Sequence, residues 1–382
     1  MKKVFIKTFG CQMNVRDSEV ICGILEKEGF KITDNEKIAD VILINTCAVR
    51  QHAEDRVWSE IGSHKKRMVQ GAGCRVIIGL IGCMAQNYQE RAFERAENID
   101  FVVGPQDIEK IPEIIKSLSG DRDIRGAGKI IFERKIWETD GEVRSEEIYH
   151  TGFYQNKEHA FVVISEGCEN FCSYCVVPYV RGKLRHRAHE EIIKEIKQAI
   201  KKGITKFTLL GQNVNAYKSQ VDFIGLLDSV NKIKGLKEFG FMTSHPKDTS
   251  IELIEAINKL DKLKKCLHLP IQSGSDKILK LMNRKYTAKS YMELAKEFRK
   301  IVKGGLLSTD IIVGFPGESE KDFKATYDLM KKLKFNAAYI FKYSPRPRTE
   351  AVIMVDDVSK EEKERRHKLI LELQRKISKE KK

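Results

Sequence analysis

The chain has 382 residues, of which 41% are apolar and 32% are charged, a balance typical of a folded protein with a substantial core. At ~150 residues per domain, a chain of this length is expected to form two or three domains. The longest apolar runs, such as Leu306–Phe315, are far shorter than the ~20 residues that span a bilayer. The N-terminal segment Met1–Lys7 has no long apolar stretch either. We therefore expect a cytoplasmic protein rather than a membrane or secreted one.

Lys and Arg number 69 against 54 Asp and Glu, which gives a formal net charge of +15. An excess of this size favours polyanionic partners, nucleic acid first. It is spread along the chain, however, so it is also compatible with a basic surface of no special purpose. The nine cysteines are an odd number in a chain that we expect to be cytoplasmic. They disfavour a disulfide framework and favour metal or redox chemistry.

Residues 1–118 alternate between strand and helix patterns. Apolar runs predict strands at 4–8, 41–44, 76–81 and 101–103. Helical patterns follow them at 15–28, 48–68, 86–97 and 108–118. Continuous apolar strands that alternate with helices indicate a parallel sheet covered on both faces. We therefore predict an N-terminal three-layer α/β domain over residues 1–118.

Residues 119–158 interrupt this alternation with turn-rich stretches, and we predict a linker that contains a hairpin. Alternation then resumes, with strands predicted at 160–165, 206–210, 238–242, 266–269, 307–313 and 337–341. Six strands are too few for a closed eight-stranded barrel. We therefore predict an open, partial (β/α)6 barrel over residues 159–358. Residues 359–382 are predicted to form a charged helix, a pattern more typical of a solvated face than of a binding element.

Three closely spaced cysteines follow the first barrel strand. Cys168, Cys172 and Cys175 are separated by three and then two residues. Three thiolates can bind three irons of a 4Fe–4S cluster and leave the fourth iron open for a substrate. A zinc site would need a fourth protein ligand, for which His186 or His189 could serve. The spacing favours the cluster, and it resembles the Cys-x-x-x-Cys-x-x-Cys signature of radical S-adenosylmethionine (SAM) enzymes.

A second set of cysteines is defined by position in the predicted fold. Cys11, Cys47 and Cys83 each follow one of the first three predicted strands. Because the carboxyl ends of parallel strands meet at one sheet edge, these thiols could converge there and hold a second cluster. Taken singly, a free cysteine is more often a small buried hydrophobe. We interpret the three remaining cysteines in that structural sense: Cys22, Cys74 and Cys266.

Short motifs around both sets resemble those of the methylthiotransferases. In the N-terminal region these are Thr8–Asn14, Asn45–Arg50 and Gly82–Gln86. In the barrel region Cys172–Gly182, Gly211–Tyr217 and His268–Ser275 resemble the tRNA-modifying MiaB branch of that family. The resemblance extends from residue 1 to residue 355, nearly the whole chain.

The resemblance implies 2-methylthiolation of isopentenyl-adenosine beside the tRNA anticodon. Carbon 2 of adenine has no easily displaced hydrogen, so the reaction needs a radical, and cofactors carry such chemistry. One 4Fe–4S cluster would bind SAM and cleave it reductively to a deoxyadenosyl radical, and the other would present the sulfur. The expected partners are a tRNA anticodon stem-loop, held by the basic excess, and a flavodoxin-like or ferredoxin-like electron donor. We expect a monomer.

The same resemblance implies a set of SAM contacts: Tyr174, Arg187, Gly211, Gln212, Asn213, His245, Gln272, Gly314 and Pro316. Other interpretations exist for some of them. The glycines are also typical of tight turns, Tyr174 of loop packing, and His245 of a structural histidine. Leu184 and His186 replace the Glu and Ser usual in the family, which puts the SAM or substrate contacts near Arg187 in question.

Three alternatives stay open from the sequence. The chain could be a methylthiotransferase for threonylcarbamoyl-adenosine in tRNA or for a ribosomal protein. It could be a zinc-binding nucleic-acid module without catalysis. It could also be a flavodoxin-like electron carrier, although the N-terminal region offers no phosphate-binding loop. Members of the family typically end with a small RNA-binding β-barrel called TRAM, and we expect this chain to lack it.

Overall fold

The computed structural model describes residues 1–48, 51–64, 76–120 and 135–380. The chain divides into two compact units. Unit 1 comprises Met1–Lys157 together with Tyr179–Gly182, and unit 2 comprises Glu158–Pro178 and Lys183–Lys382. Within the described residues no helix is both long and apolar enough to cross a membrane.

Unit 1 is built on a six-stranded, wholly parallel sheet with strand order β2-β1-β3-β4-β5-β6. Its strands are β1 (Lys3–Thr8), β2 (Lys31–Ile32), β3 (Val41–Thr46), β4 (Ile77–Gly82), β5 (Phe101–Val103) and β6 (Ile136–Glu138). Every residue of β3 and β4 is buried, as expected for central strands covered on both faces. The predicted parallel α/β sheet is therefore confirmed.

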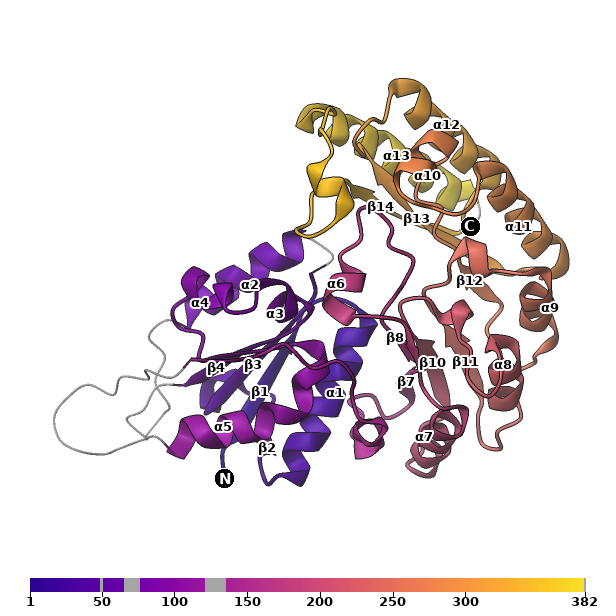
Figure 1. The fold of residues 1–382 in the computed structure, drawn as a ribbon. Coiled ribbons are helices and arrows are strands. Elements are labelled where there is room, and N and C mark those ends of the chain that lie inside the picture. The colour runs from indigo at the N-terminus through magenta and orange to yellow at the C-terminus, as the bar shows by residue number, and fades with distance from the viewer. Residues whose placement is uncertain (49–50, 65–75, 121–134, 381–382) are drawn as a thin grey trace. The chain divides into compact units, whose positions relative to one another are not determined.

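Helices cover both faces of this sheet, with α2, α3 and α4 on one face and α1 and α5 on the other (Figure 1). The helical segments are α1 (Gln12–Lys27), η1 (Glu36–Ile38), α2 (Gln51–Ser63), α3 (Cys83–Tyr88), α4 (Arg91–Arg95), η2 (Pro105–Lys110), α5 (Ile111–Gly120) and η3 (Glu146–Thr151). On the first face Val57, Ile61 and Met84 pack with Ile42 and Ile44 of β3 into one apolar core. This core fixes the central strands whose ends carry the cysteines.

Unit 1 differs from the sequence-based expectation at two places. The helix predicted over 86–97 is two short helices, because Gln89 adopts a left-handed conformation (φ 52°) between them. In the predicted linker, β6 joins the sheet edge in parallel with β5, so the described part of this segment forms no hairpin. Cys74, the predicted helix beyond residue 64 and the linker residues 121–134 lie outside the described residues.

Unit 2 contains two three-stranded parallel sheets with strand orders β11-β10-β7 and β12-β13-β14. A parallel bridge between Phe239 and Leu263 links β11 to the residues just before β12, so the six strands form an open, partial barrel. Its strands are β7 (His159–Val163), β8 (Ser165–Glu166), β9 (Arg185–His186), β10 (Lys206–Leu210), β11 (Glu238–Phe241), β12 (Cys266–His268), β13 (Leu306–Val313) and β14 (Ala337–Lys342). The open barrel predicted from six strands is confirmed.

Helices α7 (His189–Lys201), α8 (Phe223–Asn231), α9 (Ile251–Lys259), α11 (Ala288–Ile301) and α12 (Glu320–Leu333) lie along the outside of the barrel strands (Figure 1). The other helical segments that follow β8 are α6 (Val177–Arg181), whose last three residues belong to unit 1, η4 (Val214–Ala216), η5 (Pro246–Asp248), α10 (Asp276–Leu281), η6 (Glu350–Ile353) and α13 (Lys360–Glu380). Side-chain capping boxes at Thr287 and Ser319 start α11 and α12. This leaves the loops at the carboxyl ends of the strands to carry functional groups.

The charged C-terminal helix α13 is only partly a solvated face. It packs against β14 and buries Ile370, Leu373 and Ile377 along one side. On the same side the Arg366 guanidinium donates to a Glu318 carboxylate oxygen at 2.7 Å, and both side chains are buried. The last turns of the chain are therefore an integral part of unit 2.

We expect Arg366→Met to destabilise the protein by about 3–5 kcal/mol, because it leaves the Glu318 carboxylate buried without its partner. Arg365→Met is the matched control, since Arg365 is 45% exposed and its ion pairs with Glu320 and Glu362 are surface pairs worth less than ~1 kcal/mol. Urea denaturation of both variants, followed by circular dichroism, measures the difference. Equal losses in the two variants would contradict the buried pair's role.

Candidate functional site

Three cysteines of unit 1 lie at the carboxyl ends of neighbouring strands. Cys11 precedes α1 just beyond β1, Cys47 follows β3, and Cys83 begins α3 directly after β4. The sheet order reverses between β1 and β3, which is the point where ligands bind in open α/β sheets. Cys47 and Cys83 are buried and Cys11 is exposed. The fold thus brings the three predicted thiols to one edge, at its switch point.

The loop that carries Cys11 packs closely against Cys47. Gly10 has φ +131°, and a Cβ built on it would lie 2.3 Å from the Cys47 Cβ and 3.4 Å from its Sγ. Only glycine can occupy this position without moving the neighbouring cysteine. The Cys47 side chain is also close enough to lower the pKa of the Cys11 thiol. The close approach therefore holds two of the three thiols together.

Two asparagines tie the strand ends to each other. The Asn14 amide donates to the Asn45 Oδ1 and to the Thr46 carbonyl, both at 2.9 Å, while the Asn45 amide donates to the Asn14 carbonyl at 2.8 Å. The Cys11 thiol donates to the Asn14 Oδ1 at 3.2 Å. Gly82 (φ +90°) leaves room for this network, because a Cβ there would lie 2.4 Å from the Asn45 Oδ1. Asn14, Asn45 and Gly82 belong to the motifs identified in the sequence, but their hydrogen-bond network was not predicted.

Positive charge is buried beside these thiols. The Arg181 Nε donates to the Cys83 Sγ at 3.1 Å, and another guanidinium nitrogen donates to Asp17 at 2.7 Å. The Cys47 side chain, together with the Arg181 charge, lowers the pKa of Cys11 to about 6. Burial raises the pKa of Cys83, against the influence of Arg181. The site therefore favours the thiolate form at its exposed cysteine.

We expect the alkylation rate of Cys11 in iron-free protein to rise through about pH 6 and level off above it, because the thiolate is the reacting form. An ordinary thiol would instead rise near pH ~8.5. Peptide mass analysis after iodoacetamide pulses at a series of pH values measures the rate at each cysteine. Cys22, whose pKa burial raises to about 12, is the internal control and should stay unreacted. Cys47→Ala should shift the pH midpoint of Cys11 alkylation upward, because it removes the side chain that lowers this pKa most. A midpoint near ~8.5 in the parent protein would contradict the lowered pKa of Cys11.

The second trio lies in one loop of unit 2, directly after β8. The Cys175 backbone N–H donates to the Cys172 carbonyl at 2.8 Å, which folds the loop back on itself. Ser173 ties the loop to the end of α10 through hydrogen bonds of 3.1 and 2.8 Å to backbone carbonyls there. Burial raises the pKa of Cys175 to about 12, with the nearby Cys172 and Cys168 adding to the effect. The three thiols are therefore close enough to influence one another.

The residues predicted to contact SAM after β10 lie against this loop. A Cβ at Gly211 would lie 2.3 Å from the Ser165 Oγ, so glycine is needed where the two segments meet. The Gln212 side-chain oxygen accepts from the backbone N–H of Gly167 at 2.6 Å. Gln212 thus holds the residue that precedes Cys168. These contacts place the segment beside the cysteine loop.

Four buried polar atoms at the strand ends of the barrel have no hydrogen-bond partner among the described residues. They are the Ser165 Oγ, the Asn213 Oδ1, the Ser244 Oγ and the Gln272 Oε1. Buried polar groups are normally paired, so a set of unpaired ones facing strand ends indicates a polar ligand. Gln272 also has a left-handed backbone (φ 71°), which is uncommon for a residue other than glycine. Ser165 was not predicted as a site residue, because its pattern is that of an ordinary strand end.

Tyr174 and the Gly314–Pro316 segment, also predicted SAM contacts, pack together. The Tyr174 ring meets the Phe315 ring edge-on, with centroids 6.5 Å apart. Gly314 has φ +69°, and a Cβ there would lie 2.3 Å from the Lys363 side chain of α13. The glycine is therefore required for packing as well as for the turn.

Two further predicted contacts have partners inside the protein. The His245 ring accepts from the Lys247 backbone N–H at 3.1 Å, and burial lowers the pKa of His245 to about 2. An Arg187 guanidinium nitrogen binds Glu195 at 2.5 Å. These contacts support the structural interpretation of His245 and give Arg187 a carboxylate partner other than SAM. Their roles in SAM binding stay predictions.

Among the residues that the structure describes, neither cysteine trio belongs to a group of three potential metal ligands whose atoms all lie within 4.8 Å of one another. Within the described residues, the one set of three potential ligands whose atoms all lie within 4.8 Å is Glu36, Glu60 and His64. The Lys7 ammonium already lies 2.5 Å from the Glu60 carboxylate there. Thiols that each bind a different iron of a cluster lie farther apart than the ligands of a single ion. The backbone of His186 pairs with Ser165 in the β8–β9 ladder, and its ring meets the Tyr217 ring edge-on with centroids 5.5 Å apart.

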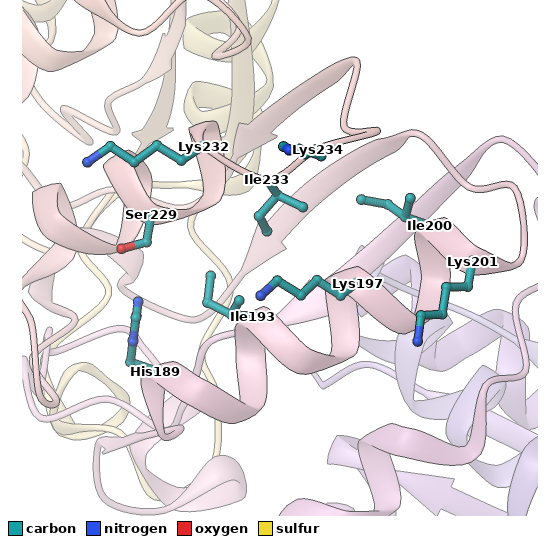
Figure 2. A pocket seen from close by; sticks show the side chains of 9 residues that line it. All are labelled: His189, Ile193, Lys197, Ile200, Lys201, Ser229, Lys232, Ile233 and Lys234. Carbon is teal, nitrogen blue, oxygen red and sulfur yellow. The ribbon is translucent and has the colours of Figure 1, made fainter.

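A basic groove of about 540 Å³ lies on the outside of the barrel, between α7 and the end of α8 (Figure 2). It is lined by His189, Ile193, Lys197, Ile200, Lys201, Ser229, Lys232, Ile233 and Lys234. All four lysines are exposed. Lys232 has an ion pair with Asp228 at 2.5 Å, and the described residues give the other three lysines none. The groove therefore presents uncompensated positive charge over an apolar floor.

Two family models match the chain. The radical SAM superfamily matches residues 162–330, and a family described as uncharacterized protein family UPF0004 matches residues 3–104. The solved structure of TsrM, a radical S-adenosylmethionine methyltransferase from Kitasatospora setae, superimposes with a TM-score of 0.63 at 14% identity, over 92% of this chain and 75% of that one. At that identity the likeness shows a shared fold.

Relatives from several bacteria carry the name tRNA-2-methylthio-N(6)-dimethylallyladenosine synthase. The protein of Thermoanaerobacter pseudethanolicus is 45% identical over 98% of this chain and 78% of its own length. That of Carboxydothermus hydrogenoformans is 41% identical over 99% of this chain and 84% of its own. With this identity over nearly all of its length, the chain belongs to the tRNA-2-methylthio-N(6)-dimethylallyladenosine synthase family of radical SAM enzymes.

Proposed function

We propose that the chain is a radical SAM methylthiotransferase that converts N6-isopentenyl-adenosine (dimethylallyl-adenosine) beside the tRNA anticodon to its 2-methylthio derivative. The observation that carries the proposal is the presence of two cysteine trios, one at the carboxyl ends of parallel strands and one in the loop after β8, in a chain 45% identical to a synthase of that name. Action on threonylcarbamoyl-adenosine or a ribosomal protein has no such support. The zinc-module and electron-carrier alternatives do not account for both trios.

We assign one 4Fe–4S cluster to each trio. Cys168, Cys172 and Cys175 would hold the cluster that binds SAM, and the trio in unit 1 would hold the second. When bound, these cofactors supply an electron, a carbon radical and sulfur, the chemistry that side chains cannot provide. The donor set fits, because three thiolates leave one iron of each cluster open. The converging thiols and the glycine-permitted approach of Gly10 to Cys47 support the assignment in unit 1.

The barrel residues would bind and orient SAM rather than react with it. The unpaired oxygens of Asn213 and Gln272 would accept hydrogen bonds from its ammonium or hydroxyl groups. The Ser165 and Ser244 hydroxyls can donate as well as accept, so they would serve its carboxylate. The Tyr174 ring offers a flat apolar surface for its adenine. Each contact restricts the orientation of SAM at the open iron, which is the main contribution that protein groups make to such chemistry.

The partners and location belong to the same proposal. The chain would act as a monomer in the cytoplasm, a reducing compartment that preserves free thiols. A flavodoxin-like or ferredoxin-like protein would supply the electron. The anticodon stem-loop would be held through its phosphates, for which the basic groove between α7 and α8 is a candidate contact. The target base would be splayed out of the loop and stacked on an aromatic ring.

The test is an anaerobic reaction with SAM, a chemical reductant and an isopentenylated anticodon stem-loop, in which deoxyadenosine and the modified nucleoside are measured by mass spectrometry. The parent should form both products. Cys172→Ala should form neither, because the SAM-cleaving site is lost. The triple variant Cys11→Ala, Cys47→Ala, Cys83→Ala should still form deoxyadenosine but no methylthio nucleoside.

Cys266→Ala is the matched control, since Cys266 is a half-buried cysteine outside both trios, and it should form both products at parental levels. Iron content of each variant is measured alongside. Wild-type methylthio nucleoside from the triple variant would show that the unit 1 thiols are structural. Modification of a threonylcarbamoylated stem-loop in preference to the isopentenylated one would refute the substrate assignment.

We expect Lys197→Gln, Lys201→Gln and Lys234→Gln together to weaken binding of the stem-loop and flatten its salt dependence. Each phosphate contact contributes ~0.7 to ~0.9 to the slope of log affinity against log salt, so the loss is up to that amount per lysine. Fluorescence anisotropy between ~50 and ~200 mM salt measures the slope.

The control removes the same charge from α12, with Lys324→Gln, Lys331→Gln and Lys332→Gln. These three lysines are also exposed, and the described residues give them no ion pair. Equal slopes for the two triple variants would mean that the charge acts through the whole chain, and the groove would then not be a specific RNA contact.

A further inference from the structure

Each cysteine trio has one buried arginine that donates a hydrogen bond to one of its sulfurs. In unit 1 the Arg181 Nε lies 3.1 Å from the Cys83 Sγ. In unit 2 a terminal nitrogen of Arg284 lies 3.3 Å from the Cys172 Sγ. Arg181 is 2% exposed and Arg284 is 8% exposed. Burying a guanidinium is costly unless negative charge compensates it, so both positions require an explanation.

Arg181 is held in place by a second hydrogen bond, to a carboxylate that it shares with another arginine. One oxygen of Asp17 accepts from Arg181 and the other from Arg144, each at 2.7 Å, and all three side chains are buried. Two guanidinium groups therefore share one carboxylate. Arg181 is the member of this group that touches a thiol.

Arg284 has a different environment. It donates to the Tyr286 hydroxyl at 2.7 Å, to the Pro270 carbonyl at 3.0 Å and to the Cys172 sulfur. None of the hydrogen bonds or ion pairs that the structure shows for Arg284 within the described residues involves a carboxylate. Its positive charge is thus balanced by the thiol site itself once Cys172 is a thiolate.

We propose that Arg181 and Arg284 are positioning residues, one for each iron–sulfur site, and that each raises the reduction potential of the cluster in its own unit. This inference rests on the assignment of the two trios made above. A hydrogen bond to a ligating sulfur and a nearby positive charge both stabilise the more negative, reduced state of a cluster. Groups that bond to ligands in this way also fix the orientation of those ligands. Neither arginine was predicted from the sequence to have this role.

The test measures the potential of each cluster separately, in the full chain. One background carries Ala at Cys168, Cys172 and Cys175, and so retains only the unit 1 site. The other carries Ala at Cys11, Cys47 and Cys83, and so retains only the barrel site. Arg181→Gln and Arg284→Gln are introduced into both backgrounds, and midpoint potentials are obtained from redox titrations followed by electron paramagnetic resonance.

We expect Arg181→Gln to make the unit 1 cluster at least tenfold harder to reduce, which for one electron is about 59 mV, and to leave the barrel cluster unchanged. Arg284→Gln should make the barrel cluster harder to reduce by the same amount and leave the unit 1 cluster unchanged. Each variant is therefore the control for the other, because both remove one buried guanidinium. Unchanged potentials, or the same shift in both clusters from one variant, would overturn the proposal.

A lysine at each position keeps the charge but cannot reproduce the planar fork of donors. Arg181→Lys and Arg284→Lys should therefore shift the same potentials in the same direction by a smaller amount. If a glutamine variant fails to fold, as judged by circular dichroism, the lysine variant decides, and an unchanged potential there would overturn the proposal. The midpoint potentials of both clusters are measured without RNA, so an error in the assigned substrate would not affect this test. An error in the cysteine assignment would appear earlier, as a background without its single cluster.

Discussion

The candidate chemistry of this chain depends on one geometric constraint: neighbouring parallel strands end level with one another. In unit 1 the register pairs Thr8 with Asn45 and Thr46 with Gly82, so the residues that follow β1, β3 and β4 emerge at one edge. In unit 2 the cysteine loop and the unpaired polar atoms likewise follow strand ends of the open barrel. Two different parallel architectures thus gather distant residues by the same principle.

Thiolates gathered in a buried site are stabilised by positive charge nearby, and the two units supply that charge differently. A thiolate in a buried place is unfavourable, as the raised pKa of Cys83 and of Cys175 shows. In unit 1 two arginines share the Asp17 carboxylate, and one of them, Arg181, places buried positive charge against Cys83. In unit 2 the Arg284 cation has hydroxyl, carbonyl and sulfur partners. In unit 1 the arginine already has a carboxylate partner. In unit 2 the described partners of Arg284 include no carboxylate, so the negative charge that balances it must come from the cysteine site.

Most of the fold could be predicted from the sequence because its strands are apolar runs. The predicted barrel strands coincide with β7, β10, β11, β12, β13 and β14 to within two residues at each end. The two-residue strand β2 and the short β6 have no such run, so they were not predicted. The prediction of one helix over 86–97 was wrong, because the chain turns at Gln89, where φ is positive. The spacing of apolar residues does not reveal such a turn.

For the site as well, features set by local sequence could be predicted, and contacts between residues far apart in the sequence could not. The cysteines could be predicted from spacing and from their position after strands, both of which are local. The bond between Arg284 and Cys172 joins residues 112 positions apart, and the ion pair between Arg144 and Asp17 joins residues 127 apart. Periodicity cannot predict such pairs, because it reports which face a residue occupies and not which distant side chain it meets there.

Arg181 shows how the two kinds of information combine. It lies in the motif that begins at Cys172, only a few residues beyond the barrel trio, so local spacing associates it with that site. Its contacts are instead with Asp17 and Cys83, within unit 1. The crossing of Tyr179–Gly182 into unit 1 is therefore more than a connection. Through it, a segment that follows Cys175 in the sequence supplies the buried cation beside the thiols of unit 1.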